Sequence, residues 1–180
     1  NAQNRAAAYD FDGDRKADVA VFRPEHGTWY ILKSSDGGFA AAQWGISTDK
    51  PVPADYDGDR KTDLGVYRDG TWYVWKSSDQ SYLFGQFGIA TDKPIPSDFD
   101  NDGRADLNVF RDGAWHSLQS SDNSYKFAQF GKTGDRPLPS DYDSNRRSDI
   151  AVFRGGLWFV KYQNELPLNT AQFGVTSDKP

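Results

Sequence analysis

An acidic loop recurs four times along this chain of 180 residues. In each copy, side-chain oxygens fall at loop positions 1, 3, 5 and 9, a spacing that lets one turn of backbone wrap several carboxylates around a hard cation. The candidate ligands are Asp10, Asp12, Asp14, Asp18, Asp55, Asp57, Asp59, Asp63, Asp98, Asp100, Asp102, Asp106, Asp141, Asp143, Asn145 and Asp149. A single acidic turn is common without metal, but four matched copies favour metal binding. We expect about four structural calcium ions.

The four loops differ in their ligands. The fourth has three carboxylates rather than four, with Asn145 at position 5 and the arginines Arg146 and Arg147 beside the ion. We expect the weakest site there. We expect the strongest in the third loop, because Gly103 at position 6 can adopt a left-handed turn that costs other residues roughly 1 kcal/mol. An EF-hand is the rival metal site, but it needs a glutamate at position 12 and flanking helices, where this sequence favours strands.

The net charge of −5 is concentrated in the loops, because 15 of the 26 acidic residues lie at candidate ligand positions. The chain therefore lacks the basic bias of a nucleic-acid-binding protein. Its mean hydropathy is −0.78 and no run approaches a membrane span or an N-terminal signal, so we expect no membrane insertion. Cysteine is absent, which leaves bound metal as a means of stabilising an extracellular domain. Methionine is absent even at position 1, which suggests a processed or excised fragment.

A unit of about 43 residues repeats around the loops. In the second unit, two prolines mark a short extended segment before the loop, and Asp69-Gly70 marks a hairpin between runs rich in β-branched and aromatic residues. A last strand beginning at Tyr82 completes a four-stranded antiparallel meander. Only the first unit departs, with a two-residue insertion in the hairpin at 24–27. The repeats lie at approximately 5–49, 50–92, 93–135 and 136–180, within a single domain at 1–180.

The strand after each loop shows only weak alternation of polar and apolar residues, as in 64–67 (Leu-Gly-Val-Tyr), which indicates that both of its faces are buried. A small sheet covered on both faces and repeated at about 40 to 50 residues is typical of a β-propeller blade. We therefore predict an all-β fold, a β-propeller of four four-stranded antiparallel blades. The blades either close as a four-bladed ring or form half of a larger or dimeric ring, so a homodimer through the end blades is expected as one alternative.

The loop pattern Asp-x-Asp-x-Asp-x-x-x-Asp leading into a strand resembles the FG-GAP/VCBS repeats of integrin-type calcium-binding β-propellers, over essentially the whole chain. The acids of the first three loops match the calcium positions of that family. The family usually has glycine at loop position 6, which only Gly103 satisfies, whereas Arg15, Arg60 and Arg146 replace it elsewhere. The resemblance implies a secreted or cell-surface protein.

Other repeated residues favour structural roles. The tryptophans recur at one strand position in every unit, which favours packing between blades over a sugar-stacking platform. One arginine per unit stands beside a recurring aspartate turn and favours a structural pair over an anion-binding site. The tryptophans are Trp29, Trp72, Trp115 and Trp158, and the arginines are Arg23, Arg68, Arg111 and Arg154. His26 and His116 occupy non-equivalent places without a nucleophile motif, so we expect no enzymatic activity.

Together these patterns predict a calcium-stabilised, extracellular, non-catalytic recognition or adhesion module with a protein or glycan ligand. One alternative is a carbohydrate-binding lectin domain, which glycan-array binding would favour. Another is the accessory propeller domain of a secreted polysaccharide- or protein-degrading enzyme, which an adjoining catalytic domain would favour. We expect the ligand at loops that vary between units, such as the hairpin around His26 and the segment 163–169.

Overall fold

The computed structural model describes residues 9–163 and 169–180. Within these residues the secondary structure consists of short strands and one three-residue 3-10 helix, so the all-β prediction is confirmed. The strands are β1 (Val19–Arg23), β2 (Thr28–Leu32), β3 (Phe39–Gln43), β4 (Lys50–Pro51), β5 (Leu64–Arg68), β6 (Thr71–Trp75), β7 (Tyr82–Gln86), β8 (Lys93–Pro94), β9 (Leu107–Arg111), β10 (Ala114–Leu118), β11 (Tyr125–Gln129), β12 (Arg136–Pro137), β13 (Ile150–Arg154), β14 (Leu157–Lys161) and β15 (Asn169–Gln172). The helix is η1 (Pro24–His26), formed by the insertion in the first hairpin.

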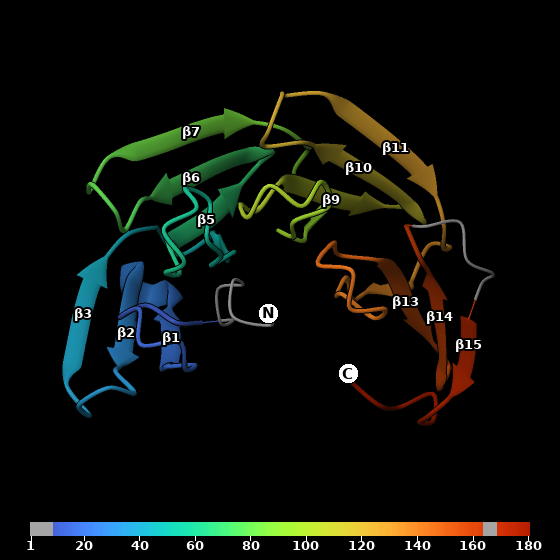
Figure 1. The fold of residues 1–180 in the computed structure, drawn as a ribbon, viewed down its shortest axis with the longest axis horizontal. Helices are drawn as coiled ribbons and strands as arrows, with labels where there is room; N and C mark the ends of the chain where they lie inside the picture. The colour runs from blue at the N-terminus through green and yellow to red at the C-terminus, as the bar shows by residue number, and fades with distance from the viewer. Residues whose placement is uncertain (1–8, 164–168) are drawn as a thin grey trace.

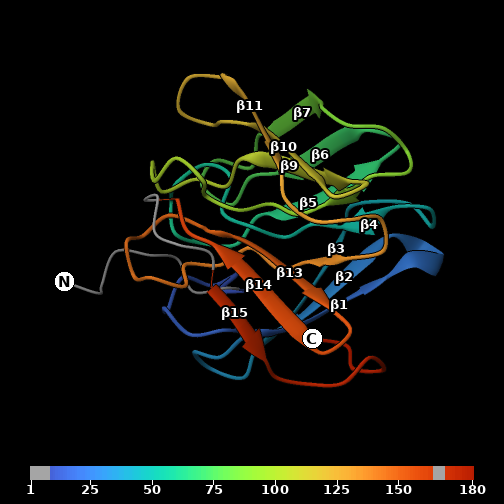
Figure 2. The same cartoon turned by 90° about the vertical axis from the view of Figure 1, so that its right-hand side faces the viewer.

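The strands form four antiparallel sheets in which neighbours in space are also neighbours in sequence. We call them blade 1 (β1–β3), blade 2 (β4–β7), blade 3 (β8–β11) and blade 4 (β12–β15). The expected inner strand of blade 1, near Arg5, lies outside the described residues. The blades follow one another around a common axis, with β3, β7, β11 and β15 on the outer side (Figure 1). Figure 2 views them from the side of blade 4. The fold is a four-bladed β-propeller, as predicted.

The hydrophobic core lies between blades rather than within one. Trp72 and Val74 of β6 are fully buried and pack against Val109 of blade 3. Trp115 of β10 packs in the same way against Ile150 of blade 4. The side chains alternate along β6, so every second residue reaches the neighbouring blade. The expectation that the repeated tryptophans pack between blades is therefore confirmed for these two.

The first strand of blade 1 departs from this burial. Val66, Val109 and Val152 are each 1% exposed where they meet the preceding blade. The equivalent Val21 is 55% exposed, and Val19 on the same strand is 68% exposed. The expectation that both faces of this strand are buried is thus correct for blades 2 to 4 and wrong for blade 1. The physical reason is that no described segment covers the side of blade 1 on which a preceding blade would pack.

Ion pairs fix the turns that lead from one blade to the next. Asp49, before β4, is buried and accepts two hydrogen bonds from the guanidinium of Arg68, at 2.6 and 2.8 Å. Such a bidentate pair holds its two partners in one geometry. Arg111 with Asp92 and Arg154 with Asp135 repeat it, so the structural interpretation of these arginines is confirmed. No helix in the described part of the chain is long and apolar enough to cross a membrane.

Candidate metal sites

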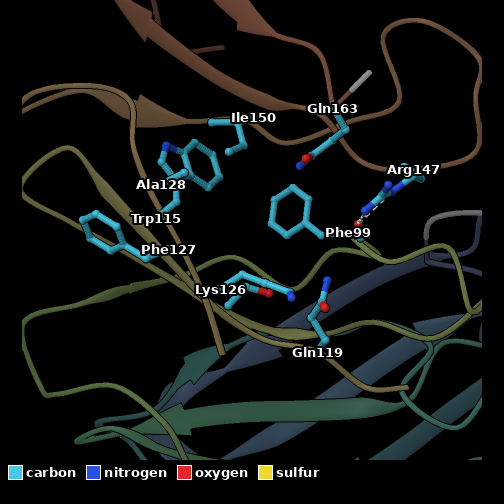
Figure 3. A pocket seen from close by; sticks show the side chains of 10 residues that line it. Phe99, Trp115, Gln119, Lys126, Phe127, Ala128, Arg147, Ile150 and Gln163 are labelled. Carbon is cyan, nitrogen blue, oxygen red and sulfur yellow. Dashed lines mark hydrogen bonds between the residues drawn. The ribbon is translucent and has the colours of Figure 1, made fainter. Parts of the chain in front are cut away.

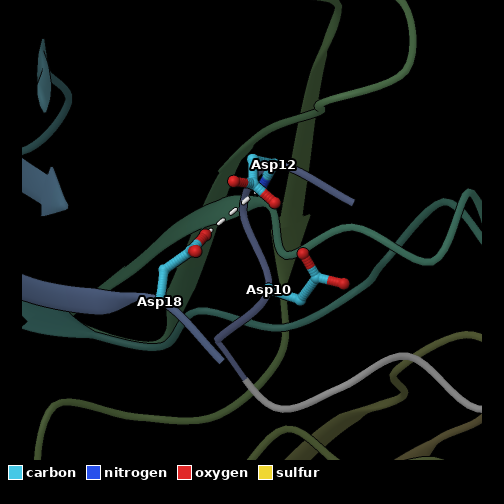
Figure 4. Close-up of side chains that lie close together, drawn as sticks. All are labelled: Asp10, Asp12 and Asp18. Atoms are coloured by element: carbon cyan, nitrogen blue, oxygen red, sulfur yellow. Dashed lines mark hydrogen bonds between the residues drawn. The ribbon is translucent and has the colours of Figure 1, made fainter. Parts of the chain in front are cut away.

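Each acidic loop folds so that the carboxylates at positions 1, 3 and 9 converge. In the first loop, one oxygen from each of Asp10, Asp12 and Asp18 lies within 4.8 Å of the others (Figure 4). The other clusters are Asp55, Asp57 and Asp63; Asp98, Asp100 and Asp106; and Asp141, Asp143 and Asp149. The spacing read from the sequence thus brings together three side chains per blade.

Backbone N–H groups hold these carboxylates in place. In the second loop, Asp55 accepts hydrogen bonds from the N–H groups of Gly58 and Arg60, at 2.7 and 2.8 Å. Asp63 accepts one from Tyr56 at 2.8 Å and one from Ser77, in the turn after β6, at 2.7 Å. Comparable bonds recur in the other three loops. The last aspartate therefore ties the loop to the turn that follows two strands later, and the cluster keeps its shape through the loop's own hydrogen bonds.

Position 6 of every loop has a left-handed backbone. Arg15, Arg60 and Arg146 have φ angles of 71°, 73° and 75°, and Gly103 has 88°. This conformation costs a residue with a Cβ atom about 1–2 kcal/mol relative to glycine. The conformation expected for Gly103 is therefore confirmed, and the three arginines adopt it at a cost.

The position-5 side chains lie outside the three-carboxylate clusters. Nε and Nη2 of Arg104 both donate to one oxygen of Asp102, Oδ2, at 2.9 and 2.6 Å, and Asp59 accepts a hydrogen bond from the Ser77 hydroxyl at 2.8 Å. In the fourth loop the Asn145 amide donates to Asp143 at 3.0 Å. Asp14 lies 3.5 Å from the Lys16 ammonium. The ligand role of these four remains a prediction, and Asp102 would have to leave Arg104 to join a metal.

Serine hydroxyls donate hydrogen bonds to one carboxylate in each of the first three clusters, a contact that was not predicted from the sequence. Ser35 donates to Asp12, Ser78 to Asp57 and Ser121 to Asp100, each at 2.6 Å. Each hydroxyl therefore constrains the position-3 carboxylate with a short hydrogen bond. The signal was present in the sequence as the Ser-Ser-Asp triplet that follows the third strand of the first three units. The fourth unit has Gln163 at the start of this turn instead.

Burial and like charge both raise the proton affinity of the clustered carboxylates. Burial raises the pKa of Asp55, Asp63 and Asp106 to about 6, and neighbouring loop carboxylates add to the rise, whereas hydrogen bonds from backbone N–H groups oppose it. Burial also raises the pKa of Asp98 and Asp149 above the ordinary value. A group of acids that binds protons this readily also gains from a divalent cation, which relieves the same desolvation and repulsion.

The donor set fits a hard cation. The converging atoms are all carboxylate oxygens, crowded within 4.8 Å of one another, and burial together with neighbouring carboxylates raises the pKa of Asp63 among them. Oxygen donors of this kind suit calcium, which tolerates irregular geometry and completes its six to eight ligands with carbonyls and water. The residues at positions 1, 3 and 9 are the ones that would hold it.

Each of the two histidines contacts a different side chain in its own blade. Nδ1 of His116 lies 2.8 Å from the hydroxyl of Tyr125 on β11, and burial lowers the pKa of the His116 imidazole. His26 lies in η1 beside Glu25, at 3.8 Å. The structure therefore places them in different blades and in ordinary contacts.

Comparison with known proteins agrees with the repeat architecture. Residues 10–66 match the family model described as an FG-GAP-like repeat. The matched stretch covers less than half of the chain. It spans the first two acidic loops and the strands between them, and loops three and four of the structure share its clustered geometry. No curated protein matches the chain.

Two solved structures resemble the propeller. An Agrocybe aegerita lectin, solved for its specific recognition of non-reducing terminal N-acetylglucosamine, superposes with a TM-score of 0.61 at 18% identity, over 89% of this chain and 50% of that one. BBS1N, solved in complex with ARL6DN, superposes with a TM-score of 0.51 at 13% identity, over 96% of this chain and 59% of that one. The chain therefore spans half to three-fifths of the solved chains it matches, and at these identities the likeness concerns the fold.

Proposed function

We propose that this propeller is a calcium-stabilised, non-catalytic recognition or adhesion module that acts outside the cell. The observation that supports it is the same three-carboxylate cluster at the equivalent place in all four blades, each held by its own loop. One ion per blade would link the loop to the start of the following strand and neutralise charge that otherwise opposes folding. Carboxylates committed to such a role are poor proton donors, which supports a binding function rather than catalysis.

Calcium titration at two pH values tests the metal role. By calorimetry on calcium-free protein we expect about four ions per chain at pH 7 and weaker binding at about pH 5. The reason is that Asp55, Asp63 and Asp106 have folded-state pKa values of about 6, so protons compete with calcium at the lower pH. These values lie above the ordinary 3.8. The same linkage makes the calcium-free protein more stable as pH falls through 6, with the full gain below about pH 4.

The calcium occupancy of each loop, measured at limiting calcium, ranks the four sites. The fourth loop should fill last, because it has one carboxylate fewer than the others. A filled fourth site beside an empty third would contradict the ranking, and calcium binding that does not change with pH would contradict the assigned ligands.

A glycan ligand is the second candidate function. The structural likeness to a lectin favours it, although at 18% identity that likeness concerns the fold and leaves the ligand of this chain as a proposal. The likeness to BBS1N in a complex supports a protein ligand in the same way. An accessory role beside a catalytic domain is compatible with the same propeller.

We also propose that two copies of the chain pair through their end blades. Blade 1 exposes Val19 and Val21, the residues that every later blade packs against its predecessor. Blade 4 exposes Phe173, at 79%, directly after β15, the strand that pairs with the one carrying Trp158. Joining the two ends repeats the interface between blades and gives an eight-bladed ring, within the usual range of about four to eight.

Light scattering tests this pairing. We expect twice the chain mass of 20.2 kDa. Val21→Asp should return the mass to that of one chain. It should leave the melting temperature of the unpaired chain unchanged, because Val21 is already exposed there. A wild-type mass of 20.2 kDa at micromolar concentration would exclude the paired ring.

A further inference from the structure

Blade 3 departs from its neighbours at one cross-strand pair. Asn108 on β9 lies directly opposite Ser117 on β10, so both side chains project from the same face of the sheet. The equivalent pairs in the other blades combine glycine or alanine with a β-branched apolar residue. These pairs are Ala20 with Ile31, Gly65 with Val74, and Ala151 with Val160.

Both polar side chains of this pair are buried and incompletely bonded. Asn108 is 1% exposed and Ser117 is 7% exposed. The Asn108 amide donates to Ser97 O at 2.8 Å, but its Oδ1 atom and the Ser117 Oγ atom have no hydrogen-bond partner among the described residues. Buried oxygens without partners lose hydration without compensation. A sheet face that is apolar at this pair in the other blades therefore carries two buried polar atoms in blade 3 with no hydrogen-bond partner among the described residues.

Ser117 faces a pocket of about 200 Å³ between blades 3 and 4 (Figure 3). Trp115 and Lys126 line it from blade 3, and Ile150 and Gln163 line it from blade 4. Lys126 pairs with Ser117 across β10 and β11, so its side chain lies on the same face.

Two changes from the repeat account for this hollow. In the interface between blades 2 and 3, Val74 and Leu83 take the places of Ser117 and Lys126, and both belong to the packed core there. Replacing two apolar side chains by a smaller hydroxyl and a flexible amine leaves the space unfilled in blade 3. The pocket is therefore encoded by the residues in which blade 3 differs.

The lining is cationic and rich in hydrogen-bonding groups. Arg147 donates from Nε and Nη2 to the carbonyl of Phe99, at 3.0 and 2.7 Å, which fixes its guanidinium at the pocket wall. Lys126 adds a second cation, and no aspartate or glutamate lines the pocket in the described part of the chain. Gln119 and Gln163 offer amide groups, and Figure 3 shows both pointing toward the space beside Phe99 and Lys126.

We propose that this pocket binds one acidic sugar residue, a hexuronic acid. A volume of about 200 Å³ is below the roughly 300–1,000 Å³ of pockets for drug-sized ligands, so one ring is the matching size. Trp115, Phe99 and Ile150 are 3%, 6% and 7% exposed, so they offer only a narrow apolar edge to the ring. Ser117 and the glutamines suit its hydroxyls, and Lys126 and Arg147 suit its carboxylate. This assignment rests on the proposed recognition function and names its ligand class.

Binding of methyl glucuronide to the full chain in calcium buffer tests the assignment. We expect saturable binding by NMR titration, and binding of methyl glucoside weaker by about tenfold or more, because the neutral sugar lacks the carboxylate that the two cations would pair. Equal binding of both sugars, or no binding of the glucuronide at millimolar concentration, would overturn the proposal.

Variants that restore the repeat sharpen the test. Ser117→Val together with Lys126→Leu recreates the residues of blade 2 and should abolish glucuronide binding while the melting temperature stays equal or rises. Lys76→Leu is the matched control, because it removes one lysine from blade 2 away from this pocket and should leave binding unchanged. Unchanged binding in the double variant would overturn the pocket assignment. Calcium binding, measured on the same samples, reports separately on the proposed function: intact calcium binding without glucuronide binding rejects only the pocket.

Discussion

Removal of calcium is expected to lower the midpoint of thermal unfolding by roughly 10–20 °C. A site whose free calcium stands about tenfold above its Kd contributes about 1.4 kcal/mol to stability, and four such sites act together. In a chain of this length each kcal/mol shifts the midpoint by about 2–4 °C. The measurement is thermal unfolding by circular dichroism in EDTA and in millimolar calcium. An unchanged midpoint would contradict the structural role of the metal.

Single-site variants separate metal binding from general charge effects. Asp63→Asn keeps the size of the side chain but weakens one metal site, and its single amide oxygen can accept only one of the two hydrogen bonds that Tyr56 and Ser77 donate. Its calcium-dependent gain in midpoint should be about a quarter smaller than that of the wild type, as expected for one site of four. Asp79→Asn is the control, since Asp79 is an exposed acid in the turn after β6 and lies outside every carboxylate cluster. It should retain the full gain.

The propeller could be predicted from the sequence because the same residue types recur at a regular spacing in every unit. The spacing of Trp29, Trp72 and Trp115 placed a packing residue at one register in each blade, and the structure buries all three to 3% exposure or less. A repeat also predicts which residues face a neighbour. It does not predict whether the first and last units have one, which is why the exposure of Val19 and Val21 appeared only in the structure.

The carboxylate clusters could be predicted in part. Positions 1, 3 and 9 converge as their spacing indicates, because the loop backbone between them is short and held by their own hydrogen bonds. Position 5 could not be placed, since its side chain has competing partners that are distant in sequence or variable between loops: Ser77 for Asp59 and Arg104 for Asp102. The pocket in blade 3 was missed for a related reason. It arises from two residues that break the repeat on different strands, and only their pairing across β10 and β11 shows that they adjoin.

Replacing Trp72 by alanine is expected to lower the free energy of unfolding by about 3–5 kcal/mol, the usual cost of deleting a large buried aromatic side chain. Trp72 is 0% exposed, its Nε1 donates to the carbonyl of Phe87 at 2.8 Å, and its ring lies edge-on to Tyr67 with centroids 5.2 Å apart. Urea unfolding in saturating calcium measures the loss. Trp72→Phe retains part of the ring volume and should cost less, so it provides a second reading if the alanine variant does not fold.

Trp158 provides the matched control for this substitution. It holds the same place in blade 4 and makes the same bond, to the carbonyl of Phe173 at 3.1 Å, but no fifth blade covers it in the described chain and its side chain is only half-buried. In the Val21→Asp background, which is expected to keep the chain unpaired, Trp158→Ala should therefore cost clearly less than Trp72→Ala, because less apolar surface and a smaller cavity are involved. If Trp72→Ala instead remained fully stable and lost sugar binding, the tryptophans would form the ligand platform and the packing interpretation would fail. Without Val21→Asp, the proposed pairing covers blade 4, so the losses at the two positions should become similar.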